Sequence, residues 1–145
     1  MNKIDLLHQE GALKSYFPNS KIIRNGNNEI IWSSEIRPSA LSSLYTLKLH
    51  YEYKKQIRIF VISPTKLALA EGKTELPHVY STVKQQLCLY YPKDKEWDLG
   101  MYYVHTLIPW ASEWLIHYEL WVSTGTWHGG GIPHEIESEK QETIN

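Results

Sequence analysis

The stretch that decides the fold runs from Leu76 to Pro92 and reads LPHVYSTVKQQLCLYYP. It holds Cys88, the only cysteine in the 145-residue chain, so an intrachain disulfide is excluded. Cys88 follows His78 by ten positions and stands in a short apolar segment, residues 87–91, that ends at a proline. An account of function has to decide whether this thiol is a nucleophile or a small core residue.

Two interpretations of Cys88 are open. Cysteines outside disulfides are among the most buried residue types and pack as small hydrophobes. If residues 87–91 form a strand, however, Leu87 and Leu89 share one face and Cys88 lies on the other, because side chains alternate along a strand. The leucines are the better candidates for the core. We therefore expect Cys88 to be accessible to solvent and to a substrate.

An accessible thiol is sufficient for acyl transfer. The thiolate is the reactive form, and an ordinary thiol has a pKa near ~8.5. The few per cent of thiolate present at neutral pH support transfer between thioesters, because sulfur is intrinsically nucleophilic. Such chemistry also needs a hydrogen-bond donor for the oxyanion and a positioned amine.

The residues around Cys88 resemble the active-site segment of ubiquitin-conjugating enzymes. Those enzymes carry a His-Pro-Asn motif, then the nucleophilic cysteine at this spacing in an Ile/Leu-Cys-Leu context, then a tryptophan in the following loop. His78, Leu87-Cys88-Leu89 and Trp97 take these places. The longer stretch 76–131, with its segments PHVY, EW, IPW and WHGG, is closer still to a bacterial branch. That branch belongs to antiphage operons, especially those built on cyclic-oligonucleotide signalling.

The resemblance implies covalent carrier chemistry. Cys88 would attack an activated C-terminal carboxyl, hold it as a thioester and pass it to an amine, usually a lysine, in the service of antiphage defence. His78 would brace the active-site loop, and Trp97 would shape the loop beyond the cysteine. In this chain the proline precedes the histidine, and Tyr80 stands where the family has an asparagine. We expect the Tyr80 hydroxyl to donate the oxyanion hydrogen bond in its place.

The same resemblance implies a protein partner. It is a nucleotidyltransferase that makes cyclic oligonucleotides, or a small ubiquitin-like protein. An alternative hypothesis is a non-catalytic adaptor of the same fold that binds one of these partners. The Tyr80 departure favours the adaptor, whereas the presence of Cys88 favours catalysis.

Composition predicts a cytoplasmic protein with one folded domain. Hydrophobic residues make up 42% of the chain and the formal net charge is -1, which gives no electrostatic reason to expect nucleic acid or a membrane as partner. No apolar stretch approaches the ~18 residues of a membrane span, and the N-terminus does not read as a signal peptide. We expect one domain over residues 1–132 and an acidic, disordered tail over residues 133–145.

The chain before Cys88 predicts the first half of an α+β fold, as in ubiquitin-conjugating enzymes. A helix is expected over Ile4–Phe17, and a four-stranded antiparallel meander over Lys21–Arg24, Glu29–Ile36, Ser43–Tyr53 and Gln56–Ile62. Asn25-Gly26 is a strong hairpin signal, and residues 43–53 alternate apolar and polar side chains. Residues 63–86 show no clear periodicity, so we interpret them as a long active-site loop with a short strand at its end.

C-terminal helices complete the predicted fold. After a charged turn at Pro92–Glu96, a short helix is expected over Leu99–Leu107. A longer helix should follow, with Pro109 at its first position and Gly125 as its C-terminal cap. Its aromatic residues recur at spacings of four and three, which places them on one face for packing against the sheet; they are Trp110, Trp114, Tyr118 and Trp121.

Other site chemistries fit these residues less well. His117, His128 and His134 are spaced by eleven and six residues, which matches no familiar zinc pattern. Residues 129–131 are glycines, but no strand precedes them and no Gly-Lys-Ser/Thr follows, which disfavours a phosphate-binding loop. We therefore expect neither a metal nor a cofactor.

A papain-like pair is a further alternative, in which Cys88 would work with His78 or His105. Those enzymes usually place the cysteine at the start of a helix. Here the cysteine stands in a predicted strand that ends at a proline. The thioester interpretation is therefore preferred.

Overall fold

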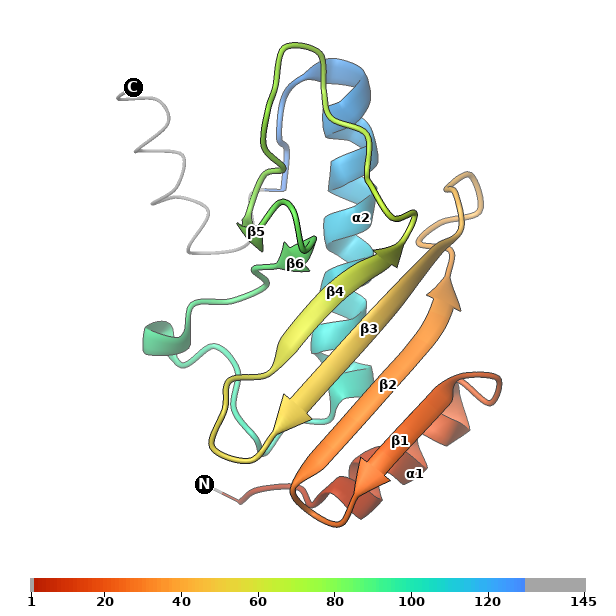
Figure 1. Cartoon of the computed structure of the whole chain (residues 1–145), viewed down its shortest axis with the longest axis vertical. Coiled ribbons are helices and arrows are strands. Elements are labelled where there is room, and N and C mark those ends of the chain that lie inside the picture. The colour runs from red at the N-terminus through yellow and green to blue at the C-terminus, as the bar shows by residue number, and fades with distance from the viewer. Residues whose placement is uncertain (1, 130–145) are drawn as a thin grey trace.

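An antiparallel sheet is the frame of the molecule in the computed structural model, which describes residues 2–129. The described part of the chain forms six strands in the order β1-β2-β3-β4-β6-β5 across the sheet. The two helices lie behind one face, and the opposite face is uncovered (Figure 1). The strands are β1 Lys21–Asn25, β2 Glu29–Ile36, β3 Tyr45–Glu52, β4 Arg58–Ser63, β5 Val79–Ser81 and β6 Gln86–Leu87. The helices are α1 Leu6–Tyr16 and α2 Leu107–Thr124, with 3-10 turns η1 Pro92–Asp94 and η2 Tyr103–His105.

The first four strands form the predicted meander. The turn between β1 and β2 is closed by Asn28, whose backbone N–H donates to the Asn25 carbonyl at 3.1 Å. Gly26 takes a φ of 56° there, which glycine adopts without the steric cost of a Cβ. Along β3, buried and half-buried side chains alternate strictly. The hairpin signal and the period-two pattern were therefore sufficient to predict this part of the sheet.

The sheet is larger than predicted because β5 and β6 extend it beyond β4. Strand β6 pairs with β4 in antiparallel fashion, with Phe60 opposite Gln86. Gln85 is 3% exposed and fastens the preceding loop. Its side-chain amide donates to the carbonyls of Val61 and Pro64, and its amide oxygen accepts from the Leu67 N–H. The prediction of a four-stranded sheet is thus wrong, because one buried polar side chain organises a loop that shows no periodicity.

Helix α1 confirms the predicted N-terminal helix and is shorter by two residues at its start and by one at its end. Asp5 is its N-cap and accepts from the His8 N–H at 2.9 Å. The buried Gln9 donates to the Met101 carbonyl and accepts from the Tyr103 N–H. These two bonds tie α1 to the segment that precedes α2.

The predicted helix over residues 99–107 is wrong, since only the 3-10 turn η2 forms there. The Thr106 hydroxyl donates to the Tyr102 carbonyl and accepts from the Trp97 indole N–H, and these bonds fix the turn that leads into α2. Helix α2 begins at Leu107, so Pro109 is its third residue instead of its first. That position is still in the first turn, where a missing N–H breaks no helical bond.

The aromatic face of α2 is core, as predicted, for three of its four members. Trp114 is 0% exposed, and Tyr118 and Trp121 are each 4% exposed. Trp110 is half-buried and packs against the core cluster. The helix ends at Gly125 with a φ of 78°, which confirms the predicted C-terminal cap.

Two sequence predictions concern the tail and the membrane. The tail predicted over residues 133–145 lies outside the described residues. Among residues 2–129, neither helix is sufficiently long and apolar to cross a membrane.

Candidate active site around Cys88

Cys88 lies directly after β6 and is buried. It is 7% exposed, and its neighbours Leu87, Leu89 and Tyr90 are 2%, 4% and 8% exposed. The predicted alternation fails because β6 ends at Leu87, so the following residues do not follow the pleat of a strand. The prediction that Cys88 is accessible to solvent is therefore wrong.

The surroundings of the Cys88 sulfur are nevertheless polar. The backbone N–H of Cys88 donates to the His78 carbonyl at 3.1 Å. The thiol lies 3.9 Å from the Tyr90 carbonyl oxygen, at the distance of a weak S–H hydrogen bond. Although Cys88 is buried, it does not belong to the main apolar core cluster. The thiol is thus enclosed without being packed as one more core hydrophobe.

Tyr80 on β5 covers this thiol. The tyrosine is 50% exposed, but its hydroxyl lies 3.5 Å from the Tyr90 carbonyl and hydrogen-bonds the Cys88 sulfur. This contact lowers the pKa of the thiol and raises that of the tyrosine. The structure therefore brings Tyr80 and Cys88 together.

Burial sets the protonation state of this pair. It raises the pKa of the Cys88 thiol, and the nearby Glu96 carboxylate adds to the rise. The hydrogen bonds from Tyr80 and to the Tyr90 backbone act in the opposite direction and are smaller. Burial likewise raises the pKa of Tyr80, with the Cys88 charge next in importance. Both groups are protonated at neutral pH in the resting protein.

Alkylation of Cys88 should accordingly be slow at neutral pH. Because the folded pKa lies above that of an ordinary thiol, we expect the iodoacetamide rate to reach half its maximum above ~pH 8.5. The stability that the buried neutral thiol contributes should be complete below ~pH 8.5 and lost as pH rises through the folded pKa. Rates followed by intact mass, with the urea-unfolded chain as control, measure the shift. A folded midpoint at or below the unfolded one would contradict it.

His78 positions the cysteine through its backbone. Its carbonyl accepts from the Cys88 N–H and also from the Trp114 indole N–H at 3.2 Å. The residue takes a φ of 49°, an uncommon conformation that turns the chain into β5. Its ring packs on Trp127 with 5.0 Å between centroids. These contacts fix the backbone of His78 beside Cys88 and α2.

Trp97 holds the segment that follows Cys88. It is 8% exposed, and its indole N–H donates to the Thr106 hydroxyl at 3.0 Å. Its ring lies between those of Tyr90 and Tyr103, with centroid distances of 5.6 and 6.2 Å. Trp97 therefore links the chain after the thiol to the entry of α2.

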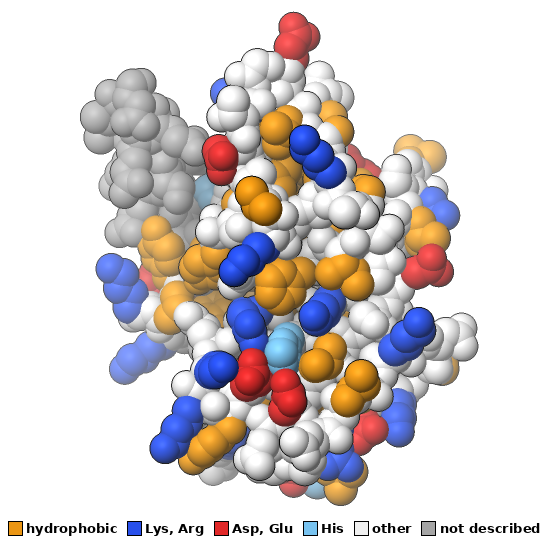
Figure 2. All heavy atoms as spheres, viewed as in Figure 1, with side chains coloured by type: hydrophobic (Ala, Val, Ile, Leu, Met, Phe, Trp, Pro, Cys, Tyr) orange, Lys and Arg blue, Asp and Glu red, His pale blue; other side chains and the backbone are white. Residues whose placement is uncertain are grey.

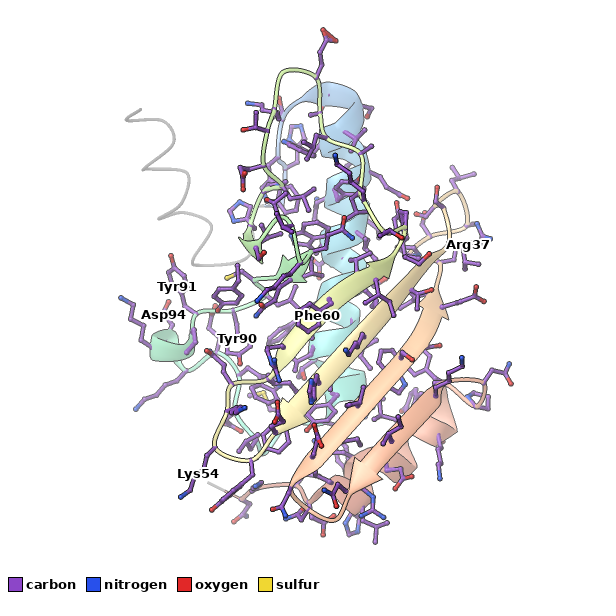
Figure 3. All side chains as sticks on the ribbon, viewed as in Figure 1. Arg37, Lys54, Phe60, Tyr90, Tyr91 and Asp94 are labelled. Atoms are coloured by element: carbon purple, nitrogen blue, oxygen red, sulfur yellow. The ribbon has the colours of Figure 1, made fainter. Side chains whose placement is uncertain are left out.

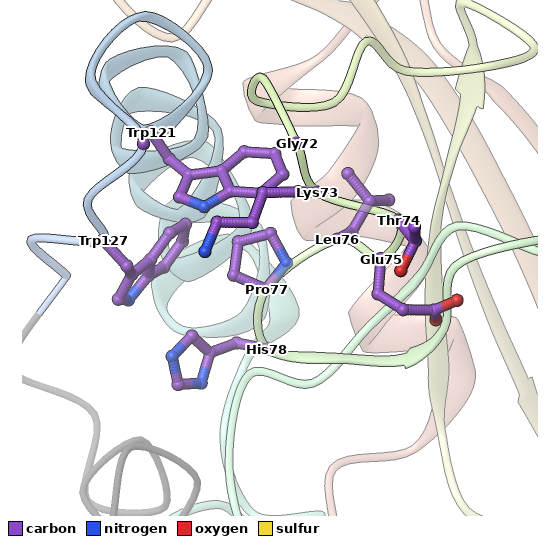
Figure 4. Close-up of a pocket in the computed structure, with 10 residues that line it drawn as sticks. Gly72, Lys73, Thr74, Glu75, Leu76, Pro77, His78, Trp121 and Trp127 are labelled. Carbon is purple, nitrogen blue, oxygen red and sulfur yellow. The ribbon is translucent and has the colours of Figure 1, made fainter. Parts of the chain in front are cut away.

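A cavity of about 380 Å³ lies on the His78 side of the site. It separates the loop at residues 72–78 from the end of α2 (Figure 4). Trp121 and Trp127 form one wall, and the Lys73 side chain extends toward Trp127 across the opening. His78 lines this cavity, and its backbone carbonyl accepts from the Cys88 N–H, so the cavity lies next to the candidate site.

The sequence analysis missed a charged network on the uncovered face of the sheet. Lysine and arginine side chains gather there around a histidine and acidic groups over β3 and β4 (Figure 2). His50 contacts Glu29 through Nε2 at 2.7 Å, and Arg58 donates to His50 Nδ1 at 3.2 Å and to Glu52 at 2.5 Å. The alternation of β3, which places His50 and Glu52 on one face, is the sequence signal that could have indicated it.

This network has the composition of a metal site but the hydrogen bonding of an ion-pair network. The ligand atoms of Glu29, His50 and Glu52 lie within 4.8 Å of one another. Arg58 can only donate, so a neutral His50 accepts at Nδ1 and carries its proton on Nε2, the nitrogen that faces Glu29. That proton occupies the place where a metal would bind. Of the histidines considered above, His117 packs against Trp127, and His134 lies outside the described residues.

The fold and site together define an α+β protein with one tyrosine-covered thiol at the end of a sheet strand. A family model described as Type II CBASS E2 protein matches residues 9–135. The chain belongs to this family of E2-like proteins of antiphage CBASS operons, which confirms the resemblance drawn from its sequence. A comparison with curated proteins found no match.

Proposed function

We propose that this protein is a ubiquitin-conjugating-enzyme-like acyl carrier that forms a thioester on Cys88 with the C-terminal carboxyl of a partner protein. The observation that carries the proposal is the placement of the Cys88 sulfur between the Tyr80 hydroxyl and the Tyr90 carbonyl. Membership of the E2-like CBASS family supports it. The proposed fold is accordingly that of a ubiquitin-conjugating enzyme.

The first step consumes a carboxyl already activated as a thioester or an acyl adenylate. Cys88 loses its proton, and its sulfur forms a bond to the acyl carbon while the thiolate or nucleotide leaves with its electron pair. Because the Cys88 pKa is raised, the thiol needs an acceptor for that proton, and the leaving group can supply one. The second step is attack by an amine, which breaks the carbon–sulfur bond and returns a proton to the sulfur.

Tyr80 takes the oxyanion role in this proposal. Its hydroxyl contacts the sulfur and lies 3.5 Å from the Tyr90 carbonyl, so it is within reach of a carbonyl oxygen attached to the sulfur. A donor aimed at developing negative charge lowers the barrier to transfer. His78 and Trp97 act as positioning residues through the contacts described above. We place the protein in the cytoplasm and propose no cofactor, metal, nucleic acid or membrane for the reaction.

Tyr80→Phe should therefore slow discharge of a preformed Cys88 thioester by about tenfold. This is less than the ~10²–10³ lost with a fully enclosed oxyanion donor, because Tyr80 is half exposed. A single-turnover discharge assay with excess lysine measures the step alone. Val83→Ala, a change at an exposed side chain, is the control for handling and folding. Discharge at the wild-type rate would assign Tyr80 to covering the thiol only.

The proposed partner is a nucleotidyltransferase that makes cyclic oligonucleotides, or a ubiquitin-like protein. Co-expression of the chain with the proteins of its operon, followed by intact mass spectrometry, tests the proposal. We expect a 1:1 adduct whose mass is the sum of both chains less one water, and which dithiothreitol releases. A complex that associates without any such adduct would refute the carrier function.

A non-catalytic adaptor of the same fold is the second candidate. The burial of Cys88, at 7% exposure with a raised pKa, is the observation that favours it. An adaptor would bind its partner equally well with or without the thiol. The two functions therefore differ in whether the substitution of Cys88 changes the covalent state of the complex.

A further inference from the structure

A second cavity, of about 290 Å³, lies between the start of β4 and the β5–β6 pair. Strands β4 and β6 pair in register at Phe60 and Gln86, and the Val61 N–H donates to the Gln85 carbonyl beside that pair. One wall of the cavity is formed by the turn into β4, residues 55–58, and the other by Tyr80 and Gln86. Tyr80 thus borders both this cavity and the Cys88 sulfur.

Arg58 on the cavity wall is held in place by the network on the sheet face. Its Nη2 donates to Glu52 at 2.5 Å and to His50 Nδ1 at 3.2 Å, and His50 is in turn fixed by Glu29. The side chain remains 32% exposed. Within residues 2–129, Nη1 has no acceptor, and Nε is buried without one. Most of the donors of this guanidinium are therefore unused.

The lining of the cavity is positively charged. Lys55 and Arg58 line it, and no carboxylate of the described residues does. Both cations contact Glu52, so this single carboxylate is shared between two positive charges. A neighbouring cavity, also about 290 Å³, is lined by Lys54 and Lys55 and also by Asp98 and Tyr90. Lys54 stands at the turn before β4 and Tyr90 in the segment after β6 (Figure 3). The charged side chains that line the cavity beside Tyr80 are both cations, so that cavity favours an anionic ligand.

We propose that the cavity between residues 55–58 and Tyr80 binds a carboxylate side chain in the C-terminal tail of the acyl donor. The Nη1 group of Arg58 and the Lys55 ammonium can each donate a charge-assisted hydrogen bond to such a carboxylate. The inference rests on the proposed function, because it is the tail of the acyl donor that has to reach the Cys88 sulfur past Tyr80. Arg58 and Lys55 are then specificity residues that select a tail with an acidic residue a few positions before its terminal carboxyl.

Peptide thioesters test this selection on the full chain. Three hexapeptides that end in a glycine mercaptoethanesulfonate thioester, and that carry Glu, Gln or Lys three positions before the glycine, are reacted with the protein and followed by intact mass. We expect the Glu peptide to acylate Cys88 about fivefold faster than the Gln peptide, and the Lys peptide to be slowest. High salt should reduce the difference, since the site is partly exposed.

Variants of the residues that line the cavity test whether the cavity causes the preference for the Glu peptide. Arg58→Gln should bring the Glu/Gln rate ratio close to one, and Arg58→Lys, which keeps the charge and loses the Nη1 donor, should leave an intermediate ratio. Lys55→Gln should lower the ratio in part. Lys21→Gln, an exposed lysine on β1 at the far edge of the sheet, is the matched control and should keep the wild-type ratio. Equal rates for the Glu and Gln peptides with the wild-type chain would overturn the proposal.

A binding measurement keeps this test separate from the test of the carrier function. Fluorescein-labelled hexapeptides ending in a plain carboxamide are titrated into Cys88→Ser, where no thioester can form. Preferential, Arg58-dependent binding of the Glu peptide supports the cavity even if Cys88 proves unreactive toward every thioester. Acylation of Cys88 without that preference in either assay would support the carrier and refute the carboxylate site.

Discussion

Cys88→Ala is expected to abolish every dithiothreitol-labile adduct between this protein and its partner. The chain contains one thiol, so no other side chain can form a thioester. The expected change is therefore complete loss of the adduct rather than a slower rate. Co-expression of each variant with the partner, followed by intact mass spectrometry with and without dithiothreitol, measures the outcome.

Two controls separate chemistry from folding. Because Cys88 is buried at 7% exposure, its replacement with alanine removes packed volume, and we expect a loss of about 1 kcal/mol in the free energy of unfolding. Cys88→Ser keeps the size of the side chain and replaces sulfur with a hydroxyl. Any acyl group that it captures will be held as an ester, which dithiothreitol does not cleave. If Cys88→Ala still forms the adduct, another residue forms the covalent bond and the assignment to Cys88 is wrong.

The sequence predicts the fold well where a repeating or turn-forming pattern within one segment determines the structure of that same segment. Residues 43–53 alternate, and β3 follows. Asn25-Gly26 marks the first turn, and Gly26 takes there a φ of 56°, which glycine adopts at no steric cost. Trp114, Tyr118 and Trp121 recur with the helical period, and all three are core.

The exposure of Cys88 could not be predicted in the same way. Alternation around Leu87 and Leu89 assigns faces only while the chain remains a strand, and β6 ends at Leu87. The cover over the thiol comes from Tyr80, which reaches it from β5 across a strand pair. Such a contact depends on tertiary pairing, and no periodicity in either segment encodes it.

Polar side chains account for the other departures. Gln85 satisfies backbone groups of the loop after β4, and Thr106 bonds the Tyr102 carbonyl and the Trp97 indole. Each fixes a segment where the sequence shows no pattern or suggests a helix. Arg58 escaped notice because its partners Glu52 and His50 lie on the neighbouring strand β3, and Glu29 joins the network from β2 through His50. The resemblance predicted the candidate site around Cys88, whereas the charged wall beside it became visible only in the folded chain.

Trp114 connects the core to the candidate active site. It is 0% exposed and stacks on Tyr118, with 5.5 Å between ring centroids and 4° between ring planes. A further contact joins it to Trp127 at 5.8 Å. Its indole N–H donates to the His78 carbonyl, which also accepts from Cys88. Removal of the indole thus affects both the packing of the helix and the loop that carries the thiol.

Trp114→Ala should therefore lower the free energy of unfolding by on the order of 3–5 kcal/mol, the range for large aromatic residues deleted from a core. Chemical denaturation measures this loss. Trp114→Phe retains most of the ring and lacks the N–H, so it isolates the bond to His78, for which we expect about 1 kcal/mol beyond the packing change. Leu120→Ala, on the same helix but 45% exposed, should change stability far less. If Trp114→Ala instead melts like the wild type and loses its partner, the aromatic face of α2 is a binding surface, and its assignment to the core is wrong.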